Sequence, residues 1–564
     1  MRSRRLKQTK SILLAVTSCV LASIVFAQPD PAIEPNAIDR YVDKRDRAFE
    51  WQTVQIIKRV GYDVIAIDMT SQRWLNEDIV DRPLWQHRLI LTIPERINPS
   101  GTAFLYISSG SNNEEPRTSS NDLVTQIALG ANMVVAELRQ VPNQPLVFQG
   151  DGQPRYEDDL IAYTWVQYLE TGEPLWLARN PMIKSAVRAM DVISAFMKRH
   201  LDGQYPIKDF VVGGGSKRGW TTWMTGAMDE RVVGIVPIVI DVLNVERSMQ
   251  HHFDAYGFWA PSIGDYVRHG ITQRMGSAEL KRLYNLTDPM AYVHRLAMPK
   301  FVVNATGDQF FLPDSSQFYW NALPGGKWLR YVPNADHGLG NSDAGESIAA
   351  FLFALTHDVE LPTLTWTYPN DHQIDMTFSS KPIGVEVWQA TNLETRDFRL
   401  ETFGAGYAAT AYDLAEIQPN EPTRFSVATP NKGWTAWFVS ASFEIGFARP
   451  LTLTSEVRVT PNSLPFAGKD RTLPLSLTFV LYDVETDANF YEETVQAVQT
   501  SGVGGNVSIT SQANRTYINF TPIREPRLAL GAFMQFLRSK FGDDFKGALQ
   551  LESGFSATIA PGLR

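Results

Sequence analysis

Short apolar runs alternate with longer segments of helical pattern over the first two thirds of the chain. The apolar runs occupy 62–69, 87–93, 103–107, 132–137, 210–212, 232–240, 300–308 and 329–332, and the helical patterns occupy 123–129, 181–200 and 345–355. Strands that alternate with helices predict a parallel or mostly parallel sheet with helices on both faces. Chemistry in such a sheet gathers at the carboxyl ends of the strands.

Two segments interrupt this alternation. Residues 41–60 are polar, and their pattern predicts a helix ahead of the first strand. Residues 243–296 lose the regular pattern and are rich in His, Trp, Tyr and Arg. We interpret this stretch as a helical cap over the strand ends, and a helical insertion on the surface is the alternative.

The pattern changes again beyond residue 361. Alternating apolar and polar residues at 384–388, 435–445, 451–459 and 475–482 are separated by Pro, Asn and Gly turns, as in an antiparallel sandwich. We therefore expect a β-sandwich domain of the immunoglobulin type at 361–461, after a doubly wound α/β domain at 28–360. The remaining 462–564 segment is expected to be mixed α+β, with one amphipathic helix at 526–541.

The tryptophans of the predicted sandwich allow two interpretations. They could bind a protein or polymer partner at the surface, or they could fill the sandwich core and its seam with the α/β domain. The candidates are Trp366, Trp388, Trp434 and Trp437. The tail helix likewise could pack on the body or hold a partner.

Length and composition narrow the class of protein. A chain of 564 residues is too long for one compact core. Hydrophobic residues make up 44% and aromatic residues 11%, which is typical of a folded protein. The formal charge of −9 argues against a surface that binds nucleic acid.

The first 27 residues have the pattern of a secretory signal. Basic residues precede an apolar run from Ile12 to about Ile24, and Val25-Phe26-Ala27 provides a cleavage site. The run is too short for a membrane span, and an uncleaved anchor is the alternative. We expect a secreted or periplasmic protein. Cys19, the single cysteine, lies inside the signal; a lipoprotein site there is disfavoured because the preceding apolar run is too short.

The most informative stretch joins an apolar strand to three glycines and Ser216. A strand, a sharp Gly-Ser turn and a helix together form a nucleophile elbow, which needs small neighbours because strand and helix approach closely. The spacing here is Gly214-x-Ser216-x-x-Gly219, one residue longer than the usual G-x-S-x-G. A phosphate-binding loop is disfavoured because the Lys-Ser/Thr ending of a P-loop is missing. A purely structural turn is the other alternative.

Two further residues complete a possible catalytic triad with Ser216. Asp308 ends a later strand, and His337 follows the next one. The order Ser, acid, His is that of the doubly wound hydrolases, in which the histidine takes the serine proton and the carboxylate orients the histidine. Asp241, at the end of the strand after the elbow, is the alternative acid.

Other site residues follow from these positions. The Lys217 N–H and an amide of the loop after the 103–107 strand, at Ser109 or Gly110, are expected to form the oxyanion hole. Arg218 and Trp259 are candidates for substrate contact, although an arginine at this place often forms a structural ion pair. The nine histidines include no H-E-x-x-H motif, so we predict neither a metal nor another cofactor.

Several blocks of the sequence resemble the PhoPQ-activated pathogenicity-related proteins. The blocks are Glu157-Asp-Asp-Leu-Ile-Ala-Tyr-Thr-Trp165, Pro181-Met-Ile-Lys-Ser-Ala-Val-Arg-Ala-Met-Asp191, Gly215-Ser-Lys-Arg-Gly-Trp-Thr-Thr-Trp223, Pro237-Ile-Val-Ile-Asp-Val-Leu-Asn244 and Asn304-Ala-Thr-Gly-Asp-Gln-Phe-Phe-Leu-Pro-Asp314. The resemblance implies an exported protein on an α/β-hydrolase scaffold, with Ser216, Asp308 and His337 at the family's Ser, Asp and His positions. It implies no particular substrate. The elbow alone also resembles carbohydrate esterases of the glucuronoyl type.

Together these observations predict an exported serine hydrolase that cleaves an ester or amide by acyl transfer. Its substrate would be a small molecule, a peptide or a carbohydrate ester. The alternatives are a peptidase rather than an esterase, and a secreted binding or regulatory protein on an inert hydrolase body.

Overall fold

The computed structural model describes residues 35–468, 477–482, 489–500, 504–512, 515–522, 536–541, 546–551 and 556–559. The predicted signal at 1–27, with Cys19, and the first part of the predicted helix at 526–541 lie outside the described residues. Within the described ranges, none of the helices has both the length and the hydropathy of a bilayer span.

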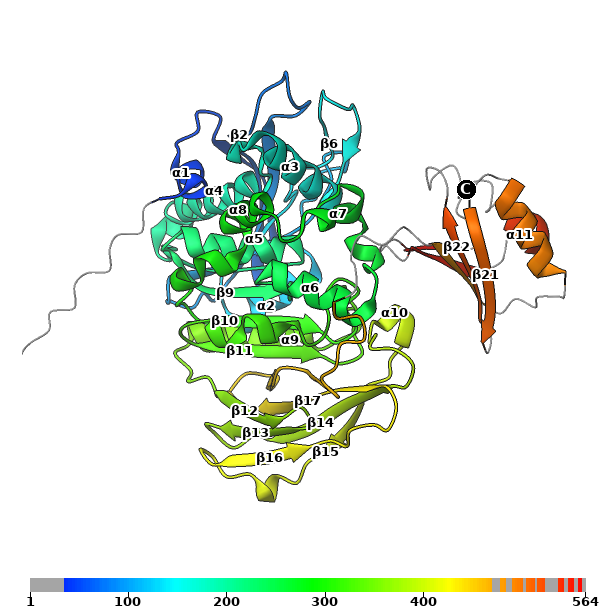
Figure 1. The fold of residues 1–564 in the computed structure, drawn as a ribbon. Coiled ribbons are helices and arrows are strands. Elements are labelled where there is room, and N and C mark those ends of the chain that lie inside the picture. Colours follow the sequence, from blue (N-terminus) through cyan, green and yellow to red (C-terminus); the bar gives the residue numbers. More distant parts are fainter. Residues whose placement is uncertain are drawn as a thin grey trace, which may run out of the picture.

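A nine-stranded sheet organises the first two thirds of the protein (Figure 1). Its strand order is β1-β2-β3-β5-β4-β8-β9-β10-β11. The first three strands are antiparallel, and the six from β5 to β11 run parallel to one another. The strands are β1 (Glu50–Arg59), β2 (Tyr62–Arg73), β3 (Leu84–Pro94), β4 (Thr102–Ile107), β5 (Val135–Leu138), β8 (Asp209–Gly215), β9 (Val232–Ile238), β10 (Lys300–Ala305) and β11 (Lys327–Val332).

Successive residues of the parallel strands point to opposite faces, and each face carries its own core. In β8, Phe210 and Val212 lie in one core and Val211 lies in the other. Helices cover both cores: α1 (Ala37–Asp43), α4 (Arg179–Met197) and α5 (Lys217–Met228) on the first face, α2 (Asp122–Ala131) and α9 (Ala344–Thr356) on the second. This is the α/β-hydrolase fold, and it confirms the predicted fold class.

The predicted helix at 41–60 is wrong. The chain ends α1 at Asp43 and then forms β1, which pairs antiparallel with β2 from Glu50↔Thr70 to Arg59↔Tyr62. Gly61 allows the hairpin turn because its φ is +87°. The strand pattern is absent from the sequence because both faces of β1 are largely exposed, so no alternation of apolar residues marks it.

Helices also occupy the segments that the strand pattern left unassigned. α3 (Glu157–Thr171) begins with three acidic residues and ends at Gly172, which is good boundary chemistry for a helix. Between β9 and β10 the chain forms α6 (Val245–Tyr256), α7 (Gly264–Arg268) and α8 (Ala278–Thr287). A two-stranded hairpin, β6 (Leu146–Val147) with β7 (Pro154–Arg155), precedes α3.

Two antiparallel sheets follow the α/β region. One has the order β12-β13-β16, and the other has the order β15-β14-β17-β18, with β19 also paired to β17. Their elements are β12 (Leu364–Asn370), β13 (Gln373–Phe378), β14 (Gly384–Asn392), α10 (Leu400–Phe403), β15 (Ala408–Ala411), β16 (Pro422–Ser426), β17 (Trp434–Phe443), β18 (Leu451–Thr454) and β19 (Arg458–Thr460).

The tryptophans of these sheets pack against protein. Trp437 is buried, and the Trp388 ring stacks on Phe438. Trp366 stacks on Trp320 of the α/β region, with ring centroids 5.7 Å apart, and donates a hydrogen bond to Glu456. Trp434 donates to Ser463. The core-and-seam interpretation therefore describes these side chains better than a binding surface.

A third antiparallel sheet lies near the C-terminus, with the order β21-β22-β20-β23-β24. Its elements are β20 (Leu477–Tyr482), α11 (Phe490–Thr500), β21 (Gly504–Gln512), β22 (Arg515–Pro522), β23 (Lys546–Leu551) and β24 (Ser556–Ile559).

Candidate active site

Ser216 stands at the turn between β8 and α5, with φ +58° and ψ −126°. A non-glycine residue in this region of φ/ψ space is strained, and such strain persists only where the surroundings impose it. Here the Ser216 N–H donates to Ile238 O at 2.8 Å, which fixes the turn against β9. The conformation is that of a nucleophile elbow.

Two glycines make the elbow possible. A Cβ at Gly214 would lie 2.9 Å from Arg218 Cβ and 3.0 Å from Ile107 O. A Cβ at Gly219 would lie 2.9 Å from Gly214 O and 3.0 Å from Ile238 O. The helix thus crosses the strand at Gly219, which explains why the glycine is needed three residues after the serine.

His337 and Asp308 come together beyond the carboxyl ends of β10 and β11. Asp308 Oδ2 lies 2.8 Å from His337 Nδ1, and Asp308 Oδ1 accepts the Phe310 N–H at 2.7 Å. Asp308 is 3% exposed. If Nδ1 carries the proton toward Asp308, Nε2 is left as the basic atom of the ring. Nε2 is buried, and it has no hydrogen-bond partner among the described residues.

The structure therefore joins two of the three predicted triad residues directly. Ser216 and His337 are not hydrogen-bonded to each other, but Phe310 relates the surroundings of the two residues. The Phe310 ring lies 4.4 Å from the His337 ring, centroid to centroid, and Phe310 and Phe311 line the same cavity as Ser216. Hydrogen bonds of catalytic groups often form only when substrate is bound.

Asp241, the alternative acid, is held elsewhere. Its carboxylate accepts the Tyr319 hydroxyl at 2.7 Å and the Tyr331 hydroxyl at 2.5 Å. Burial raises the pKa of Asp241 well above its usual value, and the two tyrosine hydrogen bonds oppose that rise. Asp308, and not Asp241, is hydrogen-bonded to His337.

The predicted oxyanion donors belong to the start of α5 and to the loop after β4. Lys217 is the first residue of α5, where backbone N–H groups have no partner inside the helix. The loop after β4 is tied to the segment after β5, because Gln140 N donates to Ser109 O and Gln144 Nε2 donates to Gly110 O. Within the part of the chain that the structure describes, the N–H groups of Ser109 and Gly110 donate no backbone hydrogen bond.

Arg218 and Trp259, the predicted substrate contacts, are both buried against protein groups. The Arg218 guanidinium is buried and binds both carboxylate oxygens of Glu157, at 2.6 and 2.8 Å, and Val141 O at 2.5 Å. Trp259 is 2% exposed and stacks on His252. The Arg218 contacts fit the alternative of a structural ion pair.

A compact ion network supports the first turn of α5. Lys217 Nζ lies 2.9 Å from Glu157 Oε2 and 3.0 Å from Asp158 Oδ2. Burial alone would raise the pKa of Glu157, but the charges of Lys217 and Arg218 hold it at about 2. The first turn of α3 is thereby locked to the elbow.

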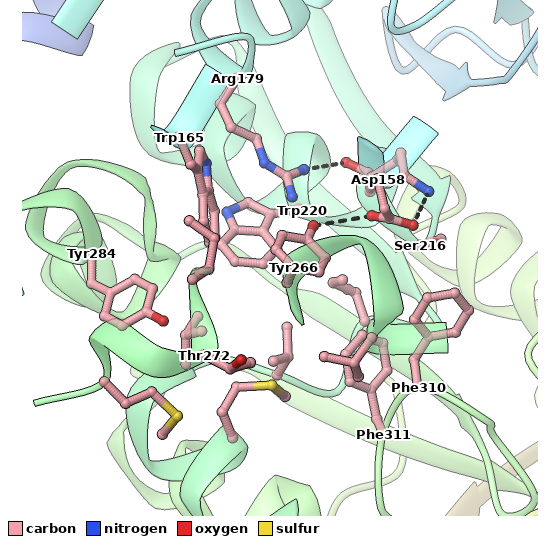
Figure 2. A pocket seen from close by; sticks show the side chains of 18 residues that line it. Asp158, Trp165, Arg179, Ser216, Trp220, Tyr266, Thr272, Tyr284, Phe310 and Phe311 are labelled. Carbon is pink, nitrogen blue, oxygen red and sulfur yellow. Dashed lines mark hydrogen bonds and ion pairs between the residues drawn. The ribbon is translucent and has the colours of Figure 1, made fainter. Parts of the chain in front are cut away.

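A narrow cavity opens beside Ser216 (Figure 2). Its volume is about 60 Å³, and its walls are mainly apolar side chains from α3, α5 and the segment between β9 and β10. Trp165, Trp220, Tyr266, Met275 and Tyr284 are among them. The polar members of the wall are Ser216, Lys217, Asp158, Arg179 and Thr272.

Sequence reasoning missed Glu157, Asp158 and Arg179 as parts of the site. The acidic pair at the start of a helix and the arginine just ahead of the predicted 181–200 helix were visible as residue types. Their convergence on the elbow was not, because it depends on the packing of α3 and α4 against α5. In the described residues, no group of three or more His, Cys, Asp or Glu side chains is arranged to hold a metal ion.

The fold and this geometry define a chain of the α/β-hydrolase class with a serine at the elbow and a His–Asp pair beside the same cavity. It belongs to the PhoPQ-activated pathogenicity-related protein family, whose model matches residues 38–399, and the predicted family is confirmed. The chain is 36% identical over 484 residues to Autocrine proliferation repressor protein A of Dictyostelium discoideum. The aligned region covers 81% of this chain and 95% of that protein.

Solved structures with a similar fold are distant in sequence. An acetyl xylan esterase from Paenibacillus sp. R4 has a TM-score of 0.40 and 14% identity, covering 56% of this chain and 92% of its own. A glucuronoyl esterase from Solibacter usitatus has a TM-score of 0.34 and 15% identity, covering 55% of this chain and 87% of its own.

Proposed function

We propose that this protein is an exported serine hydrolase that cleaves an ester or amide by acyl transfer, with Ser216, His337 and Asp308 as its triad. The observation that carries the proposal is the pairing of a strained serine elbow with a His337–Asp308 hydrogen bond of 2.8 Å. The free Nε2 of His337 is the atom that a general base needs. Asp241 is set aside as the acid because two tyrosines occupy its oxygens.

The proposed reaction has two balanced halves. Ser216 Oγ attacks the substrate carbonyl while His337 Nε2 takes the hydroxyl proton, and the Lys217 N–H binds the oxyanion that forms. The tetrahedral intermediate then collapses, and the imidazolium returns its proton to the departing alcohol or amine. Water repeats the sequence on the acyl-enzyme, which releases the acid and restores the serine hydroxyl.

The site is proposed to work outside the cytoplasm. The supporting feature is the signal pattern at 1–27, with cleavage after Ala27. The N-terminal sequence of the protein recovered from the medium or periplasm tests this point, and a mature chain that begins at Gln28 is expected.

Covalent labelling tests the serine. The full chain is treated with a fluorophosphonate probe, and we expect one labelled site that disappears in Ser216→Ala. Ser100→Ala, at an exposed turn, is the matched control and should label like the unaltered protein. Absence of label on folded protein would overturn the proposal. A panel of p-nitrophenyl esters and aminoacyl-p-nitroanilides then separates esterase from peptidase activity.

A second candidate is a secreted regulator that uses the hydrolase body only for binding. Two observations favour it: the relative from Dictyostelium discoideum is named as a proliferation repressor, and no hydrogen bond joins Ser216 to His337. The same probe separates the candidates, since an inert body would leave Ser216 unlabelled. A Ser216→Ala protein with full repressor activity in a proliferation assay would also support the regulator.

A further inference from the structure

One charged side chain in the wall of the Ser216 cavity is left over by the proposed mechanism. Arg179, the first residue of α4, is 2% exposed and lines the cavity with Ser216 (Figure 2). Its Nη1 donates to Lys217 O at 3.1 Å, so the guanidinium lies against the residue that follows the serine. Its guanidinium carbon lies 4.1 Å from the centre of the Trp220 ring.

No acidic side chain balances this arginine. Among the described residues, no carboxylate forms an ion pair with Arg179, and its buried Nε has no hydrogen-bond partner. The carboxylate of Asp158, which also lines the cavity, is taken by Lys217 Nζ and by the Tyr266 hydroxyl at 3.0 Å each. Glu157 is taken by Lys217 and Arg218.

The charges around the elbow therefore leave one positive charge in excess. Lys217 and Arg218 match Glu157 and Asp158, and Arg179 remains. Burial lowers the pKa of Arg179, with partial compensation from Tyr266 and Asp158. A buried guanidinium without a counter-charge is costly, and an anionic ligand would offset that cost.

We propose that Arg179 binds a carboxylate of the substrate, so that the enzyme cleaves esters or amides that carry an acidic group on a short apolar chain. The apolar walls of the cavity suit the chain, and the planar fork of arginine suits a carboxylate. The small volume of about 60 Å³ favours a chain of few atoms. Arg179 is thus a specificity-determining residue, and its role rests on the proposed function of Ser216.

Two esters of equal length test this inference. The p-nitrophenyl monoester of glutarate presents a carboxylate, and p-nitrophenyl valerate lacks it. In the unaltered protein kcat/KM is expected to be higher for the glutarate ester. Arg179→Gln should lower kcat/KM about 100-fold for the glutarate ester and less than about threefold for the valerate, because only the first loses a charged hydrogen bond. Arg188→Gln, on the same helix but paired with Asp191, is the control.

A second pair of substrates carries the carboxylate on the leaving alcohol instead of the acyl group. Glycolate O-acetate replaces the glutarate ester, and ethyl acetate replaces the valerate. A dependence on Arg179 in this pair alone assigns the cavity to the alcohol side, which still supports a carboxylate site. If Arg179→Gln does not fold, Arg179→Lys takes its place. This variant keeps the positive charge but lacks the planar fork, so an intermediate loss of kcat/KM is expected for the charged ester.

Binding without turnover separates the two proposals. Ser216→Ala protein is titrated with methyl hydrogen glutarate and with methyl valerate, and thermal unfolding is followed. Stabilisation by the glutarate alone, lost when Arg179→Gln is added, supports the carboxylate site even if Ser216 proves inert. The carboxylate site is overturned if Arg179→Gln lowers the charged and the neutral ester equally in both substrate pairs and neither methyl hydrogen glutarate nor glycolate O-acetate stabilises the Ser216→Ala protein. Missing fluorophosphonate labelling overturns only the catalytic proposal.

Discussion

Asp308 and Asp314 lie six residues apart along the chain, and each pairs with a histidine in different surroundings. His337 Nδ1 lies 2.8 Å from Asp308, and His251 Nε2 lies 3.0 Å from Asp314. The Asp308 carboxylate is otherwise bound by backbone N–H groups. The Asp314 carboxylate is instead also bound by Arg396 at 2.7 Å, from the segment between β14 and β15.

The atom that each histidine leaves free decides what the pair can do. His337 binds the acid through Nδ1, its Nε2 has no hydrogen-bond partner among the described residues, and its ring lies next to Phe310. His251 spends Nε2 on Asp314, and its ring packs edge-on against Phe318. A His–Asp pair therefore indicates catalysis only when its second nitrogen points toward a place where a substrate can bind.

Replacing each histidine is expected to give the largest contrast between the pairs. His337→Gln should lower kcat about 10⁴-fold, because it removes the base that activates Ser216. Its thermal unfolding should shift little. His251→Gln should instead lower the stability, by about 3 kcal/mol, because the buried Asp314–Arg396 pair loses a partner.

Kinetics with p-nitrophenyl esters and thermal melts on the same preparations measure both effects. A His337→Gln protein with near-normal kcat would contradict the catalytic role that separates the His337–Asp308 pair from the His251–Asp314 pair. Strong loss of kcat per folded molecule in His251→Gln would do the same.

The acids at neighbouring strand ends offer a sharper test. Asp308→Asn should lower kcat by about 10³- to 10⁴-fold, because an amide can stabilise the wrong tautomer of His337. Asp241→Asn should keep kcat within about tenfold, since its partners are Tyr319 and Tyr331 and not the histidine. Equal activity of Asp308→Asn and the unaltered protein would refute the assignment of the acid.

The fold was predictable where the pattern of apolar residues reflects burial. The parallel strands are buried on both faces, so continuous runs such as 300–305 mark them. β1 was not predicted as a strand because it is largely exposed on both faces, and its conformation comes from pairing with β2. α3 carried signals that could have been used, namely acidic residues at its start and Gly172 at its end.

The positions of the candidate site residues could be predicted as far as chain order and strand ends determine them. Ser216, Asp308 and His337 follow from a fold rule that places each at the end of a strand. Arg218 is buried in an ion pair with Glu157, whereas Arg179 has no such partner among the residues that the structure describes. This difference depends on contacts between α3, α4 and α5. No local sequence pattern indicates that Arg218, and not Arg179, forms an ion pair with a carboxylate.

The smallest expected effect is a difference in how pH acts on two buried carboxylates that the mechanism does not use. Burial would raise the pKa of Asp314, but Arg396 and His251 hold it well below the usual 3.8. Its stabilising contribution is thus complete above that value and is lost as the pH falls below about 4. Asp241 has a raised pKa, so its ionised form opposes folding, and the folded state gains stability as the pH falls from its raised pKa toward about 4.

Denaturant unfolding of the unaltered protein, Asp314→Asn and Asp241→Asn, followed by tryptophan fluorescence between pH 7 and pH 3, measures both contributions. Relative to Asp314→Asn, the unaltered protein should hold a constant advantage down to about pH 4 and then lose about 1 kcal/mol per pH unit. Relative to Asp241→Asn, it should gain stability between pH 7 and pH 4. If the free energy of unfolding changes with pH in the same way in both variants, Arg396 does not stabilise the ionised form of Asp314. The difference between the Asp314 and Asp308 pairs would then rest on geometry alone.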